Sequence, residues 1–312
     1  MKVKRIIQKD RSALSTIAVI AIVIVLVVAA GVVYIAVSGG NEDDAVEEAA
    51  PGTMMKYEMY EKATESAKET LSGTREINYL GQSADSYFLS VTETNGSISN
   101  FAYMMDTKSG PDDMEMIGTE EIETKYGLMT LQVWTYTKDG NQVKSYVDAE
   151  TGLGYKHEVK LATGGFVIQK LVDYNIELQK SYKESKSIGK TYKYVYEATG
   201  VTLTAEIKTV ADCMDGQFGV EYDFNSFGGK EIYFLSDNIQ GLPTDANNTG
   251  EKLTLETKKF GKVEIEVWEM FDGALLFGYD PKSHIIYQFA LISYDPVSEE
   301  NYYVTFDLDK KA

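Results

Sequence analysis

An internal repeat is the feature of this sequence that most constrains its fold. Short motifs of the first half return in the same order in the second half, displaced by 132 to 137 positions. The matching pairs are Lys56-Tyr57 with Lys193-Tyr194, Glu123-Thr124-Lys125 with Glu256-Thr257-Lys258, Val133-Trp134 with Val267-Trp268, Asp148 with Asp280, and Tyr155 with Tyr287. Both tryptophans of the chain therefore occupy the same place in two copies. We interpret this order as a tandem duplication.

The repeat divides the chain into domains. One copy is expected at residues 51–178 and the other at 188–312, joined by a polar linker at 179–187. Each copy is long enough for seven or eight short strands and a core of its own. We therefore expect two domains of the same fold.

Alternation of apolar and polar residues predicts β-strands in both copies. In Val201–Lys208, for example, Val201, Leu203, Ala205 and Ile207 fall on one face. Residues 55–71 have helix-favouring composition, but the repeat favours a strand at their start. No helical crossovers separate the strands, which disfavours a parallel α/β fold. The prediction is an all-β chain with two antiparallel domains, each a sandwich or a half-barrel.

The amino terminus is predicted to be a membrane anchor. No charged residue occurs from Ser12 to Asn41, and residues 14–38 are long enough for a transmembrane helix. Residues 1–13 are basic and residues 39–50 form an acidic tether, which places the amino terminus in the cytoplasm and the two domains outside the cell. A cleaved secretory signal is the alternative, although its apolar core is usually about 7–15 residues long.

Composition excludes several classes of function. The net charge of −18 argues against nucleic acid as a partner. The single cysteine, Cys213, rules out an intramolecular disulfide framework and is expected to be a small core residue. With His157 and His284 as the only imidazoles and no catalytic motif, we expect no enzyme activity. An acid–base pair of carboxylates is the remaining catalytic alternative.

Two segments carry a family resemblance. Residues 9–17, a short basic stretch before an Ile/Val-rich helix, resemble the amino-terminal signal of archaeal prepilin-like surface proteins, which implies processing near Ala13. The hairpin with Val147-Asp148, Thr151-Gly152 and Tyr155-Lys156 resembles that of lipoprotein-carrier-like half-barrels, as in archaeal membrane-anchored surface proteins with tandem β repeats. Copy two departs from it at Asp280-Pro281-Lys282-Ser283. The resemblance implies a curved sheet whose concave side holds an apolar ligand.

The paired tryptophans are the candidate ligand site. Trp134 with Tyr136, and Trp268 with Met270, share one face of equivalent strands and could line a concavity. The alternative is that these side chains belong to the cores, where aromatic residues are common.

A calcium loop is the sharpest local motif. Asp245, Asn247, Thr249 and Glu256 have the spacing of oxygen ligands in a twelve-residue calcium loop, with Gly250 at the turn. A polar turn before a strand explains the same residues. Calcium is the one cofactor that the sequence suggests.

Two glycosylation sequons lie on predicted turns. They begin at Asn95 and Asn247, and glycosylation of Asn247 would compete with calcium binding there.

Three functions are compatible with these features. The first is a membrane-anchored surface protein that binds an apolar ligand, a glycan or another protein. The second is a structural envelope or pilus-like component that acts through oligomerisation. The third is a carboxylate-based hydrolase.

Overall fold

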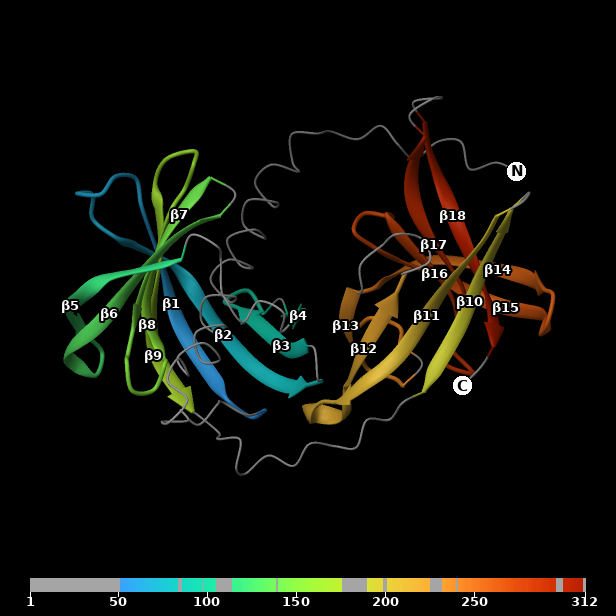
Figure 1. Cartoon of the computed structure of the whole chain (residues 1–312), viewed down its shortest axis with the longest axis horizontal. Coiled ribbons are helices and arrows are strands. Elements are labelled where there is room, and N and C mark those ends of the chain that lie inside the picture. The colour runs from blue at the N-terminus through green and yellow to red at the C-terminus, as the bar shows by residue number, and fades with distance from the viewer. Residues whose placement is uncertain are drawn as a thin grey trace. The chain divides into compact units, whose positions relative to one another are not determined.

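In this computed structural model, the segments in which apolar and polar residues alternate form β-strands (Figure 1). The structure describes residues 51–310, with gaps at 84–85, 97, 105–113, 139, 176–189, 199–200, 225–231, 240 and 296–299. Within these ranges the helical content is one 3₁₀ turn, η3 (Met214–Gly216). The prediction of an all-β chain without helical crossovers is confirmed for the described residues.

The strands form two nine-stranded antiparallel sheets. The first sheet contains β1 (Met54–Lys62), β2 (Thr70–Gln82), β3 (Ser86–Glu93), β4 (Ile98–Met104), β5 (Glu115–Thr124), β6 (Gly127–Lys138), β7 (Asn141–Val147), β8 (Gly154–Lys160) and β9 (Phe166–Asn175). The second contains β10 (Thr191–Ala198), β11 (Val201–Asp212), β12 (Phe218–Asp223), β13 (Ile232–Ser236), β14 (Asn247–Thr257), β15 (Gly261–Met270), β16 (Leu275–Asp280), β17 (Ile285–Asp295) and β18 (Glu300–Lys310). These strands fall inside the two ranges predicted for the repeats.

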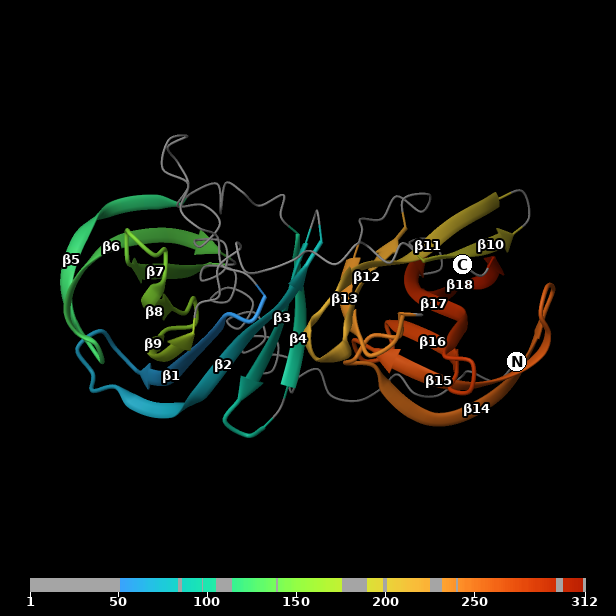
Figure 2. The same cartoon turned by 90° about the horizontal axis from the view of Figure 1, so that it is seen from below.

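Both sheets have the same strand order. It is β4-β3-β2-β1-β9-β8-β7-β6-β5 in the first and β13-β12-β11-β10-β18-β17-β16-β15-β14 in the second. Each half is thus one continuous sheet rather than two stacked sheets. Figure 2 shows the strands of the second sheet bending into an open, half-barrel-like curve. Of the two architectures that the sequence left open, the half-barrel is the one that describes this curved sheet.

Contacts divide the chain into two compact units that differ from the two sheets. In the described part, the first unit contains β1 from Met55, β2 to Ile77, and β5 to β9. The second unit contains the rest of β2, the hairpin β3–β4, and β10 to β18. Within this second unit Leu80 and Phe88 share a buried cluster with Ala211, Tyr233 and Leu235, and the Phe88 ring lies where a side chain on Gly219 would have to be.

Strand irregularities recur at equivalent positions. The pairing of β7 with β8 shifts register between Tyr146 and Val147, and the pairing of β16 with β17 shifts between Gly278 and Tyr279. A bulge bends a strand and increases its twist. The two curved sheets therefore bend at the same place.

Turn contacts recur as well. Thr151 Oγ1 donates a hydrogen bond to Asp148 Oδ2 at 2.6 Å, and Ser283 Oγ donates to Asp280 Oδ2 at the same distance. Although copy two lacks the Thr-Gly sequence, its Ser283 makes the same contact. The two hairpins therefore share geometry as well as spacing.

The amino-terminal predictions fall outside the described residues. This applies to the basic segment 1–13, the anchor 14–38, the tether 39–50 and the linker 179–187. Among the residues that are described, no helix is long and apolar enough to cross a bilayer.

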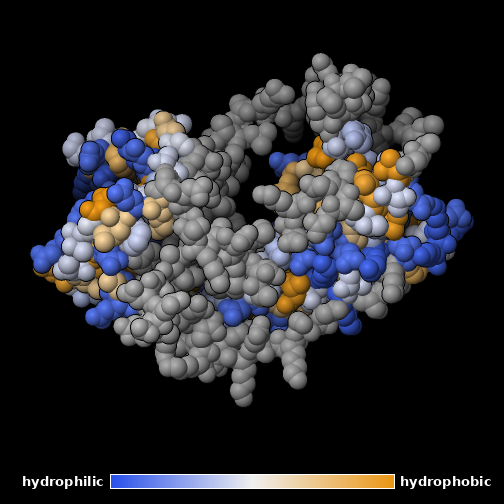
Figure 3. All heavy atoms as spheres, in the orientation of Figure 1, coloured by the Kyte–Doolittle hydropathy of each residue, from blue (hydrophilic) through white to orange (hydrophobic). Residues whose placement is uncertain are grey.

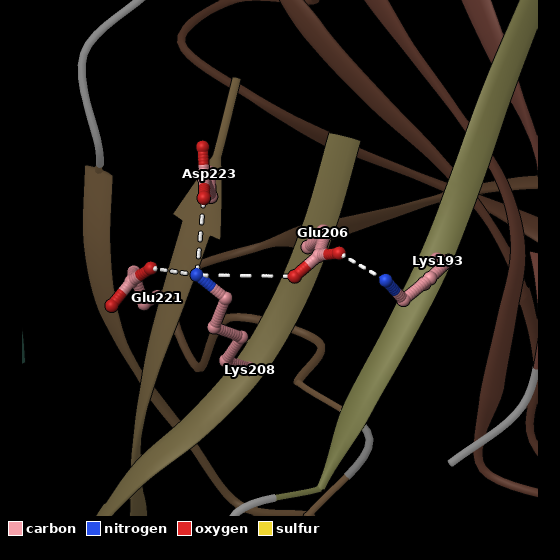
Figure 4. A network of polar contacts seen from close by, with 5 residues as sticks. All are labelled: Lys193, Glu206, Lys208, Glu221 and Asp223. Carbon is pink, nitrogen blue, oxygen red and sulfur yellow. Dashed lines mark hydrogen bonds and ion pairs between the residues drawn. The ribbon is translucent and has the colours of Figure 1, made fainter. Parts of the chain in front are cut away.

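Ion pairs connect three strands of the second sheet (Figure 4). Lys208 on β11 lies 2.8 Å from Glu221 and 3.0 Å from Asp223, both on β12, and 3.9 Å from Glu206 on its own strand. Glu206 also pairs with Lys193 of β10 at 2.7 Å. Burial alone would lower the pKa of the Lys208 ammonium group. The hydrogen bonds that it donates to Glu221 and Asp223 outweigh this effect, so that the pKa is raised overall. Lys208 thus neutralises a group of carboxylates that would otherwise repel one another.

Replacing Lys208 with methionine is expected to destabilise the second unit by about 1–2 kcal/mol at neutral pH, between the values typical of exposed and of buried ion pairs. The cause is the repulsion left among three carboxylates. Urea unfolding, followed by the fluorescence of Trp268 in a Trp134→Phe background, measures the loss. Lys193→Met is the matched control and should cost less than half as much, because Lys193 is more exposed than Lys208 and pairs with one carboxylate, Glu206, in the described part of the chain. Equal losses for both variants would contradict the prediction.

Candidate binding groove in the first unit

The pairing register of β6 to β9 assigns each side chain to one of two sheet faces. Residues directly opposite each other on neighbouring strands point to the same face. One face carries the row Thr137, Gln142, Lys160 and Phe166, with the row Thr135, Lys144 and Glu158 beside it. The other face carries the row Trp134, Ser145, His157 and Gln169.

A groove of about 440 Å³ lies in the first unit over the first of these faces. Its volume falls in the range of small-molecule sites, about 300–1,000 Å³. Its lining is mostly polar and consists of Glu65, Thr135, Tyr136, Thr137, Gln142, Val143, Lys144, Glu158, Lys160 and Phe166. The groove therefore offers hydroxyl, amide and charged groups together with one phenyl ring.

Ion pairs hold two of the charged side chains that line the groove, Lys144 and Glu158. Lys144 Nζ lies 2.6 Å from Glu120 Oε1, and the hydrogen bond between them raises the pKa of Lys144 against the opposing effect of burial. Lys144 and Lys156 each stand over the ring of Tyr146, both 4.9 Å from its centroid. These contacts hold the ammonium groups in place.

Glu158 remains ionised in this setting. Burial alone would raise the pKa of its carboxyl group, but the hydrogen bond from Lys156 and the charges of Lys62 and Lys144 lower it overall. The groove therefore carries both signs of charge in fixed positions and favours a neutral polar ligand over a strongly charged one.

Phe166 is the aromatic surface of the groove. Lys62 Nζ lies 4.8 Å from the centre of its ring. The ring is half-buried and lies at the end of the row that begins with Thr137 and Gln142.

The second unit has different chemistry at the equivalent positions. The counterparts of Lys144, Glu158, Lys160 and Phe166 are Leu276, Ala290, Ile292 and Tyr303. A smaller groove of about 280 Å³ lies in that unit, beside the turn at Asp280, Pro281 and Lys282. Thus the two sheets share a strand order, but among the described residues the charged side chains of this groove have apolar or aromatic counterparts in the second unit.

The tryptophans occupy equivalent positions in the two sheets. Trp134 on β6 is half-buried and its Nε1–H donates to Gln132 Oε1 at 3.2 Å. Trp268 on β15 is half-buried and meets Tyr279 edge-to-face, with ring centres 6.0 Å apart. Neither tryptophan lines the two grooves described above.

Tyr136 and Met270, the predicted companions of the tryptophans, are buried in the cores. Tyr136 packs against Val143 and Val159, and Met270 belongs to the large core cluster of the second unit. Tyr136 is nevertheless one of the residues that line the groove over β6 to β9, whereas Met270 lines neither groove.

The four predicted calcium ligands do not converge. Asp245 lies in a turn, whereas Asn247, Thr249 and Glu256 lie in strand β14. Asn247 pairs with Glu269 and Glu256 pairs with Lys262 of the neighbouring strand. At about 3.3 Å for each residue of that strand, this register separates the two positions by roughly 20–23 Å. The expected twelve-residue loop is therefore wrong in this structure: pairing of β14 with β15 holds the segment extended. Among the described residues, no group of three His, Cys, Asp or Glu side chains is placed to hold a metal ion.

The two sequon asparagines are exposed. Asn95 lies in the turn after β3, and Asn247 begins β14. Their exposure satisfies the steric requirement for glycosylation, which stays a prediction.

Cys213 lies directly after β11, and burial raises the pKa of its thiol to about 12. The sulfur is therefore protonated at neutral pH, which makes it a poor nucleophile.

Sequence reasoning missed the groove residues. The signal was present in β8, where Lys156, Glu158 and Lys160 alternate with His157 and Val159. Charged residues at every second position of a strand also occur on ordinary solvated surfaces, so this pattern alone does not indicate a groove.

The chain was compared with known proteins. No protein-family model and no curated protein matches it. The crystal structure of MucB in complex with MucA(peri) is 10% identical, with a TM-score of 0.28 over 89% of this chain and 92% of that one. The crystal structure of MucB is 12% identical, with a TM-score of 0.26 over 75% and 95%. The Pseudomonas aeruginosa MucA/MucB complex is 9% identical, with a TM-score of 0.25 over 88% and 92%. Likeness at this level supports no functional conclusion.

Proposed function

We propose that this chain is a non-enzymatic, extracytoplasmic binding protein, anchored in the membrane by residues 14–38, whose first unit binds a hydrophilic ligand. The observation that carries the proposal is the groove over β6 to β9, with its fixed charges and its polar lining. The anchor is supported by the uncharged stretch from Ser12 to Asn41.

The repeated sequence motifs, the shared strand order and the recurring bulges support a tandem duplication. After a duplication, one copy can keep the binding site while the other keeps the scaffold. The difference between Lys160 and Ile292 at one position is an example of such divergence.

A glycan fits the groove better than an acyl chain does. Sugar hydroxyls can hydrogen-bond to Thr135, Thr137 and Gln142, and the apolar face of a sugar ring can lie on Phe166. An acyl chain would desolvate the same polar groups without replacing their hydrogen bonds, at a cost of about 1–3 kcal/mol for each.

The test is binding of the full-length chain in nanodiscs to an array of neutral and acidic oligosaccharides. Thr137→Val combined with Gln142→Leu should weaken binding at least tenfold, which corresponds to about 1.4 kcal/mol. Thr305→Val in the second unit is the matched control and should leave binding unchanged. If the chain retained fatty acids and bound no sugar on the array, the proposal would be wrong.

A structural role is the second candidate, and exposed apolar side chains at the sheet edges favour it. On the β5–β6 hairpin Ile117 is 55% and Leu128 is 65% exposed, and on the other edge hairpin Leu253 of β14 is 43% exposed. Figure 3 also shows hydrophobic residues gathered on the visible face of the second unit. Unpaired edges with such side chains favour strand-to-strand association. Native mass spectrometry of the full-length chain would reveal the defined oligomer that this role requires.

A further inference from the structure

A row of buried polar side chains crosses the first unit on the face opposite the groove. Ser145 of β7, His157 of β8 and Gln169 of β9 lie directly opposite one another, and each is at most 2% exposed. His157 Nδ1 and Ser145 Oγ are hydrogen-bonded at 3.0 Å. His157 Nε2 and both amide atoms of Gln169 have no hydrogen-bond partner among the described residues.

The same row of the second unit is aromatic. Register places Phe277, Phe289 and Phe306 at the positions of Ser145, His157 and Gln169. The rings of Phe289 and Phe306 stack with their centres 5.0 Å apart. The fold of this module thus accommodates a fully apolar row, so that polar side chains are not a requirement of the fold.

One hydrogen bond beside this row recurs in both units. Tyr57 Oη donates to Gly154 O at 3.1 Å, and its counterpart Tyr194 donates to Ile286 O at 2.8 Å. Position 154 differs for a local reason: a Cβ there would lie 2.5 Å from His157 Nε2, whereas its counterpart in the second unit is Ile286. Gly154 therefore provides the space for the imidazole of His157. The polar row thus depends on the residue at position 154 as well as on its own three members.

Buried polar groups without hydrogen-bond partners destabilise a fold. The row of three phenylalanines in the second unit shows that apolar side chains can fill the same positions. Retention of such groups is typical of sites that trade stability for function. We propose that Ser145, His157 and Gln169 form a second ligand site in the first unit, one that receives an uncharged amide group of a ligand.

The chemistry of the row selects that group. Gln169 offers one acceptor and two donors, which an amide complements with its own N–H and C=O. The row itself contains no carboxylate or ammonium, so its three side chains offer a charged ligand no counter-charge. Half-buried Trp134 lies directly opposite Ser145 at the outer end of the row, where its indole can cover the apolar part of the ligand.

The test uses the imidazole ¹⁵N signals of the full-length chain in detergent, since the chain has two histidines. The probes are N,N′,N″-triacetylchitotriose, N-acetyl-trialanine amide and, without an amide, cellotriose. Either amide-bearing probe should shift the His157 Nε2 signal and leave the His284 signals in place, and the one that acts identifies the source of the amide. If cellotriose acts equally, or if no probe acts and the row holds ordered water only, the proposal is overturned.

Gln169→Leu should weaken the response to the amide probe at least tenfold. Gln288→Leu in the second unit is the matched control, because Gln288 is a half-buried glutamine whose amide is hydrogen-bonded to Asp307. Gln169→Phe introduces the side chain that Phe306 has at the equivalent position of the second unit. It should abolish the response and raise the melting temperature, so that the loss of response cannot be attributed to misfolding. Retained binding in a folded Gln169→Phe variant would overturn the proposal. The groove variant Thr137→Val with Gln142→Leu should leave the His157 shift unchanged, which separates this site from the proposed glycan groove.

Discussion

Replacing Phe289 with alanine is expected to destabilise the second unit by about 3–5 kcal/mol, the usual cost of removing a large aromatic side chain from a core. Phe289 is fully buried at the centre of the aromatic row. Its ring stacks on Phe306 and meets Tyr194 edge-to-face, with the centres of Phe289 and Tyr194 4.9 Å apart. A cavity at this point cannot close easily, because strands on both sides hold the neighbouring rings.

Urea unfolding can assign this loss to one unit. The chain has two tryptophans, one in each unit, so that a Trp134→Phe background leaves Trp268 as the reporter of the second unit. Tyr302→Ala is the matched control: Tyr302 is 47% exposed, and the substitution should change stability by less than about 0.5 kcal/mol. A loss below 1.5 kcal/mol for Phe289→Ala would show that the aromatic row is not the centre of this core.

The sequence was sufficient to predict an all-β chain, although each sheet has nine strands rather than the seven or eight expected. Alternation in Val201–Lys208 placed Ala205 and Ile207 on one face, and both are buried. Val133-Trp134 and Val267-Trp268, which the sequence matched by their order along the chain, lie on equivalent strands of the two sheets. Such features depend on residues that are neighbours along the chain, and a sequence shows these neighbours directly.

The sites depend on neighbours across strands, which a sequence does not show. Ser145, His157 and Gln169 are far apart in the chain and meet only once the register of β7, β8 and β9 is known. The expected calcium-loop geometry is absent for a related reason: local spacing in the sequence indicated a loop, whereas pairing of β14 with β15 extends the segment.

Acidification is expected to destabilise the first unit through His157. Burial lowers the pKa of this imidazole to about 4 in the folded chain, whereas an unperturbed histidine has a pKa of about 6.5. Below pH 6.5 the unfolded chain therefore binds a proton that the folded chain rejects. The free energy of unfolding falls as the pH drops from about 6.5 to 4, by up to about 1.4 kcal/mol per pH unit and roughly 3 kcal/mol in all. Below pH 4 both states are protonated, and the contribution does not change further.

The measurement is urea unfolding at several pH values between 7.5 and 4.5 in a Trp268→Phe background, so that Trp134 reports on the first unit. Carboxylates titrate over part of the same range, and the difference between the parent chain and His157→Phe removes their common contribution. The variant should lose most of the slope between pH 6.5 and 4.5, whereas His284→Asn, which lies in the second unit, should keep it. Parallel curves for the parent chain and His157→Phe would mean that His157 takes up a proton in the folded state as readily as in the unfolded one. The buried polar row would then be open to water.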